Sequence, residues 1–184
     1  MKYFLYVSLI LYSLGFFASL FCAVTKRGRY EGISAALILT GLAANTLGLV
    51  WRIYLTGHAP MASMYETLAF YSWTTVLVTL LVIFRYRERT VELVTLPFAT
   101  AALVFGVLNE TPGKPLTLIL RTIWFETHVS ASFAAYALFT LSFAGAALYL
   151  LRCFSGADEG ELKKFQDIAG RAVLWGFFFF SASM

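Results

Sequence analysis

The two histidines of this sequence, His58 and His128, are the side chains best suited to bind a transition metal. His128 follows Trp124, Phe125 and Glu126 at the start of an apolar stretch long enough to cross a membrane. An ionisable side chain at the edge of a bilayer is costly, so it marks a candidate functional site. The alternative is a hydrogen-bonded histidine that only helps helices to pack.

A helix starting near His128 would carry several useful side chains on one face. At 3.6 residues per turn, Trp124, His128, Ser132 and Tyr136 project from a single stripe. This stripe combines two aromatic surfaces with an imidazole and a hydroxyl, which together could contact a flat apolar ligand. Trp124 could equally be an interfacial anchor.

A second polar segment surrounds His58. Gly57 and Pro60 predict a break between two helices, and the spacing of Ser63 and Glu66 is typical of a capping box at a helix start. Arg52 could pair with Glu66 or with a carboxylate of a ligand. His58 alone could be an ordinary loop histidine.

The composition indicates an integral membrane protein. Hydrophobic residues make up 60% of the 184 residues and charged residues 13%, and the mean hydropathy is +0.76. Soluble domains are about half apolar and about a quarter charged. The length suits one all-α membrane domain over residues 1–184.

Five apolar runs predict transmembrane helices of about 20 residues each. They cover residues 3–24, 33–55, 64–84, 91–108 and 123–151, and Pro97 predicts a kink in the fourth. A sixth run, 172–184, is shorter and predicts an incomplete helix. Residues 155–170, between the fifth and sixth runs, are polar. They predict a cytoplasmic connection, either a solvated loop or a short helix, with a helical ion pair between Glu161 and Lys164.

The basic residues predict the orientation in the membrane. Ten of the 14 lysines and arginines lie in the connections after runs one, three and five, and four lie on the other side. Because Lys and Arg favour the cytoplasmic side, the N-terminus is expected outside. Both histidines then face the outer, non-cytoplasmic compartment.

Several classes of protein do not fit the sequence. The basic residues form short clusters between apolar runs rather than a basic face, which argues against nucleic-acid binding. Cys22 and Cys153 form neither a CxxC redox motif nor the CxxCH motif of a c-type cytochrome. The first apolar run lacks a small-residue cleavage site, so we expect it to be a retained helix.

Two motifs resemble the CcsA/ResC-type cytochrome c biogenesis proteins. The first is Gly57-His58-x-Pro60-x4-Tyr65-Glu66, followed by Ser72-Trp73, and the second is Trp124-x3-His128-Val129 with Tyr136 on the same helix. The resemblance extends over about the whole chain and includes the order of the helices and the outer N-terminus.

The resemblance implies a function in handling haem. Family members present haem b, bound transiently and non-covalently, on the outer face of the bacterial cytoplasmic membrane for attachment to apocytochrome c. They work with a CcsB/ResB-type membrane partner. The resemblance makes His128 an axial ligand of the haem iron. If haem binds there, Trp124, Phe125 and Tyr136 are candidate porphyrin contacts. Arg52, Lys114 and Arg121 are candidate partners of the propionates. His58 is a candidate contact without an assigned axial role.

The sequence departs from the family pattern at its C-terminal end. It stops at Met184, where the tryptophan-rich WWD segment and a second axial histidine are expected. We therefore expect the chain to be part of a haem-attachment system rather than a complete enzyme. The alternative is a cofactor-free structural subunit or a transporter-like component. Ion-coupled transport is disfavoured because the predicted spans carry few ionisable residues.

Overall fold

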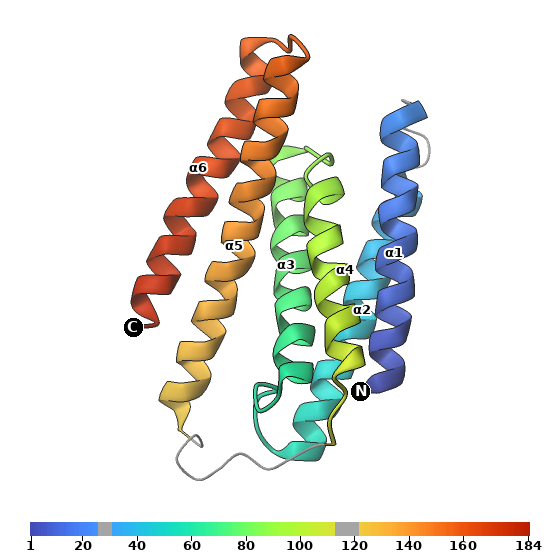
Figure 1. Ribbon diagram of the computed structural model, residues 1–184, viewed down its shortest axis with the longest axis vertical. Coiled ribbons are helices and arrows are strands. Elements are labelled where there is room, and N and C mark those ends of the chain that lie inside the picture. Colours follow the sequence, from blue (N-terminus) through green and yellow to red (C-terminus); the bar gives the residue numbers. More distant parts are fainter. Residues whose placement is uncertain (26–30, 113–121) are drawn as a thin grey trace.

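All regular elements in the described ranges of the computed structural model, residues 1–25, 31–112 and 122–184, are α-helices. The helices are α1 (Lys2–Thr25), α2 (Glu31–Thr56), α3 (Met64–Tyr86), α4 (Glu92–Leu108), α5 (Ile123–Phe154) and α6 (Glu159–Ala182). They run up and down along the long axis of the molecule (Figure 1). The predicted all-α fold is confirmed.

Four of the described helices, α1, α2, α3 and α5, are long and apolar enough to cross a membrane. The fourth predicted span corresponds to α4, which has 17 residues and therefore a length of about 26 Å. This is somewhat less than the thickness of about 30 Å of a bilayer core. The structure thus supports a helical membrane protein with four full-length spans and one shorter apolar helix.

The sixth helix begins much earlier than its apolar run predicts. It starts at Glu159 and not near residue 172, so most of the predicted connection 155–170 is helical. The side chain of Asp158 caps this helix by accepting a hydrogen bond from the backbone N–H of Glu161 at 3.1 Å. Hydropathy misses this half of the helix because its exposed side chains are charged.

The predicted ion pair within this segment is wrong. Glu161 contacts Arg152 of α5 at 3.1 Å, and Lys164 contacts Glu88 in the α3–α4 connection at 3.0 Å. Both side chains therefore join α6 to neighbouring elements instead of stabilising one turn of their own helix.

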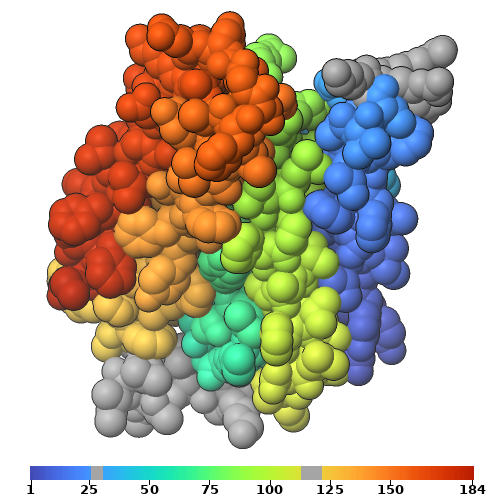
Figure 2. Space-filling model, turned by 45° about the horizontal axis from the view of Figure 1, so that its top comes forward, coloured from blue at the N-terminus to red at the C-terminus, as the bar shows by residue number. Residues whose placement is uncertain are grey.

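The helices form a bundle of α1 to α4 with an α5–α6 hairpin on one side (Figures 1 and 2). In the bundle, α1 packs on α2 and α4, and α3 packs on α4. The hairpin is attached through α5, which packs on α3, and α6 packs mainly on α5. A hydrogen bond between Tyr71 and Thr140, 2.6 Å long, also joins α3 to α5.

Glycines allow close helix contacts. A Cβ atom at Gly41 of α2 would lie 2.8 Å from the ring of Tyr12 on α1, and one at Gly15 would lie 2.8 Å from the Ile38 side chain. Between α5 and α6, a Cβ at Gly145 would lie 3.0 Å from the backbone nitrogen of Ala169. Small residues at such positions let helix backbones approach closely, which drives packing in membranes.

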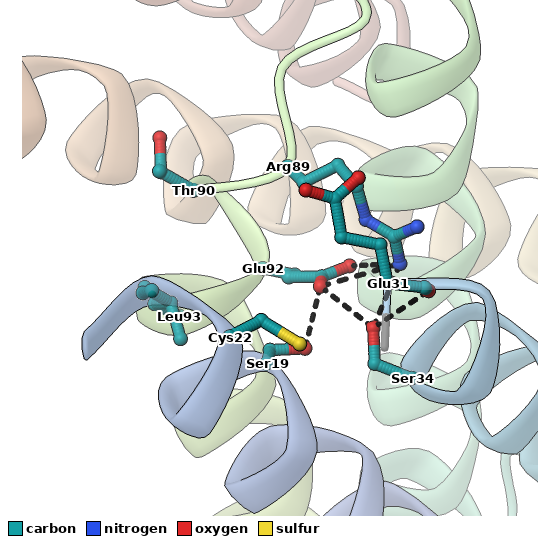
Figure 3. Close-up of a pocket in the computed structure, with 9 residues that line it drawn as sticks. Ser19, Cys22, Glu31, Ser34, Arg89, Thr90, Glu92 and Leu93 are labelled. Atoms are coloured by element: carbon teal, nitrogen blue, oxygen red, sulfur yellow. Dashed lines mark hydrogen bonds and ion pairs between the residues drawn. The ribbon is translucent and has the colours of Figure 1, made fainter. Parts of the chain in front are cut away.

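A buried carboxylate connects the bundle at the end where α4 begins. Glu92 is 2% exposed, and its carboxylate accepts hydrogen bonds from Ser19 of α1 and Ser34 of α2. Arg89 donates to the Ser34 hydroxyl at 2.8 Å and lies 3.4 Å from Glu92 (Figure 3). Three helices and the α3–α4 connection therefore meet at one polar cluster.

The contact at Gly145 predicts a difference between two glycine substitutions. We expect Gly145→Leu to lower the free energy of unfolding by about 1–3 kcal/mol, because the added side chain would collide with the α6 backbone. Gly170→Leu is the matched control, since no atom lies within 4 Å of the position of its Cβ. Denaturant unfolding in detergent measures both variants. Equal losses for the two would contradict the proposed α5–α6 contact.

Candidate functional site

The described residues that were singled out in the sequence lie where α2 ends and α3 begins, and in the first half of α5. Gly57 has a positive φ of 71° directly after the last residue of α2, and Ser63 caps α3 by accepting a hydrogen bond from the Glu66 N–H. The predicted helix break and the predicted cap of α3 are confirmed. This local structure fixes the segment that contains His58 between two helices.

The same segment is held by a buried ion pair. Arg52 Nε lies 2.6 Å from Glu66 Oε1, and the two residues are 8% and 0% exposed. The other carboxylate oxygen of Glu66 accepts a hydrogen bond from the Ala62 N–H at 2.8 Å. Arg52 also donates to the carbonyl of Thr111 at 3.1 Å, and its guanidinium lies 5.7 Å from the ring centre of Tyr65.

These contacts answer which partner Arg52 takes in the structure. Of the two partners considered from the sequence, it is paired with Glu66. The guanidinium joins α2, α3 and the segment after α4, and a paired and hydrogen-bonded charge of this kind is the form in which buried charges are tolerated.

His58 is also buried, with 5% of its surface exposed. Its Nδ1 atom lies 2.7 Å from the carbonyl oxygen of Ala59. A carbonyl oxygen can only accept, so Nδ1 carries the proton in this arrangement. The imidazole is therefore oriented by the turn in which it sits.

His128 differs from His58 because it is exposed, in the second turn of α5. Its Nδ1 atom contacts the carbonyl oxygen of Ser183, the residue after the end of α6. Nδ1 must again be the donor, so the neutral form of the ring carries its lone pair on Nε2. A histidine that binds a metal commonly uses its second nitrogen in this way, bound to a backbone carbonyl.

A contact through Glu126 brings the two histidine segments together. Its carboxylate accepts a hydrogen bond from the backbone N–H of Ala59 at 3.2 Å. The residue after His58 therefore touches the residue two positions before His128. This contact could not be predicted from the sequence, because it joins positions 67 residues apart on two different elements.

The side chains predicted to form one stripe on α5 differ in exposure and in their contacts. Trp124 is 82% exposed and Tyr136 is 44% exposed, whereas the Ser132 hydroxyl donates to the carbonyl of His128 at 2.9 Å. The ring of Tyr136 contacts Phe133 and Phe180, with centroid distances of 5.8 and 6.3 Å. Tyr136 thus belongs to an aromatic surface shared by α5 and α6.

Two points of the site prediction remain: the positions of Lys114 and Arg121 and the presence of a cluster of metal ligands. Lys114 and Arg121 lie outside the described residues. Within residues 1–25, 31–112 and 122–184, no group of three or more His, Cys, Asp or Glu side chains is arranged to hold a metal ion.

Comparisons with known proteins give consistent relatives. The family model described as Cytochrome C assembly protein matches residues 61–184. Protein HemX of Brevibacillus brevis is 34% identical over 123 residues, which are 65% of this chain and 44% of the relative. The cytochrome c biogenesis protein CcsA of Synechococcus sp. (strain CC9311) is 31% identical over 111 residues, which are 58% of this chain and 36% of the relative.

A third relative is much longer. Protein NrfI of Wolinella succinogenes is 32% identical over 117 residues, which are 60% of this chain and 13% of the relative. The chain therefore spans less than half the length of the curated relatives it matches.

The buried ion pair predicts unequal effects of two basic residues at this end of the molecule. We expect Arg52→Ala to lower the free energy of unfolding by about 3–5 kcal/mol, because Glu66 would be left buried without its charge partner. Lys2→Ala is the control, because the pair of Lys2 with Glu110 is exposed and such pairs contribute about 0–1 kcal/mol. Denaturant unfolding in detergent compares the two.

A double variant separates the charge from the packing. Arg52→Met combined with Glu66→Leu removes both charges, so its loss is expected to be smaller than that of Arg52→Ala alone. If Arg52→Ala costs no more than Lys2→Ala, the ion pair does not hold this end together.

Proposed function

Since the chain belongs to the Cytochrome C assembly protein family, we propose that it binds haem through His128 and presents it for attachment to apocytochrome c. The observation that carries this proposal is the hydrogen bond of His128 Nδ1 to the Ser183 carbonyl. In the neutral imidazole, this bond leaves the lone pair on Nε2, and His128 would hold the haem iron through that nitrogen.

The surroundings of His128 suit a flat, largely apolar ligand. Trp124 lies one helical turn before His128 with 82% of its surface exposed, and Tyr136 lies two turns after it. Aromatic side chains with free faces can pack against a porphyrin. Haem b would be bound non-covalently and transiently, because the family's task ends with its transfer to another protein.

Few basic side chains near His128 are candidate partners for the haem propionates. Arg52 is buried and paired with Glu66, so its guanidinium has little capacity for a further carboxylate. Arg121 stays a candidate partner for a charge-assisted bond with a propionate. His58 is proposed as a positioning residue, because Ala59 beside it contacts Glu126 on the helix that carries His128.

The chemistry of attachment is that of the haem vinyl groups and the cysteine thiols of apocytochrome c. The task of this chain is to hold haem in one orientation and to leave the vinyl edge open. We place this site on the outer side of a bacterial cytoplasmic membrane, beside a CcsB/ResB-type partner. The basic residues in the α3–α4 and α5–α6 connections support this orientation, because Lys and Arg favour the cytoplasmic side.

Removal of His128 tests the proposal. We expect His128→Ala to lose most of the haem Soret absorbance of the purified protein, because the axial nitrogen is absent. Imidazole added to the buffer should restore part of it, since a free imidazole can replace the missing ring. Absorption spectra of the protein reconstituted with haem measure both effects, and Tyr136→Phe is the control that keeps the aromatic ring.

Two results would count against haem binding by His128. One is an unchanged Soret band in His128→Ala. The other is a folded wild-type chain that takes up no haem, which would favour a cofactor-free subunit of a membrane complex.

Thiol labelling tests the proposed orientation. Cys153 is exposed near the end of α5, and Cys22 is buried. We expect a membrane-impermeant maleimide to label Cys153 in inverted vesicles and not in intact spheroplasts. A cysteine introduced as Ala62→Cys in a Cys153→Ser background lies at the other end of the bundle and should show the opposite pattern. The reverse labelling of both sites would overturn the outer placement of His128.

A further inference from the structure

A cavity lies between α2 and α3 at the end of the bundle opposite His128. Its volume is about 510 Å³, and its walls include Ala35 and Leu39 of α2 and Leu80, Ile83 and Phe84 of α3. Leu39 and Phe84 are exposed on the surface of the bundle. The walls are therefore apolar and lie where acyl chains surround a membrane protein.

Two side-chain contacts join α2 and α3 further along the helices, away from this cavity. The indole of Trp73 donates to the hydroxyl of Thr46 at 2.8 Å, and further along Arg52 pairs with Glu66. These bonds fix α2 and α3 relative to each other.

Charged residues surround the mouth of the cavity, and two of them already have partners. Arg89 donates to Ser34 and lies 3.4 Å from Glu92. Figure 3 draws these three residues in the polar cluster beside the cavity. Glu88 accepts hydrogen bonds from Thr90 and from Lys164 at 3.0 Å. Burial would raise the pKa of Glu88, but these hydrogen bonds outweigh it and hold the pKa below its ordinary value.

Two lining residues keep an uncommitted charge. Arg87 and Glu31 both line the cavity, and among the described residues neither forms an ion pair. The mouth therefore offers one positive and one negative group above an apolar slot.

The backbone of Arg87 gives an independent reason to consider its side chain. Arg87 ends α3 in the left-handed conformation, with φ 53° and ψ 32°, and its N–H donates to the carbonyl of Ile83 at 2.9 Å. Glycine is the usual residue at such a position, because any side chain there is strained. A strained residue with an exposed charge beside a cavity indicates a function for that side chain.

We propose that this cavity binds a zwitterionic phospholipid with a primary amine, phosphatidylethanolamine. An acyl chain lies along the apolar walls, the phosphate meets the Arg87 guanidinium, and the ammonium group meets Glu31. A purely anionic headgroup would leave Glu31 beside negative charge. A choline headgroup lacks the N–H donors that the Glu31 carboxylate can accept.

Native mass spectrometry of the full chain tests this site. The protein is exchanged into detergent with equal amounts of phosphatidylethanolamine, phosphatidylglycerol and phosphatidylcholine. We expect the wild type to retain phosphatidylethanolamine in preference to both others. Arg87→Gly should reduce its retention about tenfold, the loss expected for a charge-assisted hydrogen bond. Glycine favours the left-handed backbone, so this variant should unfold no more easily than the wild type.

Two further variants complete the test. Glu31→Gln should bring the ratio of phosphatidylethanolamine to phosphatidylcholine close to one, because the partner of the ammonium is removed. Arg85→Gln is the matched control, since Arg85 lies on the ring of Tyr86 and does not line the cavity, and it should keep the wild-type preference. Equal retention of the three lipids, no retained lipid, or a preference that survives Arg87→Gly would overturn the proposal.

Discussion

A carboxylate buried in an apolar bundle needs a partner, and both ends of the α1–α4 bundle are organised around this requirement. Glu66 and Glu92 are 0% and 2% exposed. An unpaired charge in such a place costs several kcal/mol. Glu66 is therefore paired with Arg52, and Glu92 accepts from two serine hydroxyls beside Arg89. The Arg52–Glu66 pair joins α2 to α3 at one end of the bundle. The Glu92 hydrogen bonds join α1 and α2 to α4 at the other end.

The α5–α6 hairpin depends on the bundle for its position. It is joined to α3 by the Tyr71–Thr140 hydrogen bond, to the α2–α3 turn by Glu126, and to the α3–α4 connection by Lys164. These contacts are distributed along the whole length of the hairpin. His128 lies at one end of this hairpin, where it contacts the Ser183 carbonyl and is itself exposed.

The apolar runs of the sequence predict most helices well, because the length and hydropathy of a membrane span are physical requirements. The start of α6 is not predicted, since its first half is charged and lies before the apolar run 172–184. A signal was present: Asp158 and Glu161 have the spacing of a helix cap. Partners on other elements, such as Ser183 for His128, leave no trace in a single sequence, because tertiary packing alone decides them.

Burial and hydrogen bonding separate the candidate residues that one sequence pattern had grouped together. Arg52 has committed its guanidinium to Glu66 and Thr111 inside the bundle, so it has little capacity for a ligand. His128 is exposed and uses a single ring nitrogen for its contact with Ser183. A ligand site needs a group that is positioned but not saturated, and of these two residues only His128 combines both properties. At the other end of the bundle, Arg89 is bonded to Ser34 and Glu92, whereas Arg87 forms no ion pair with the described residues.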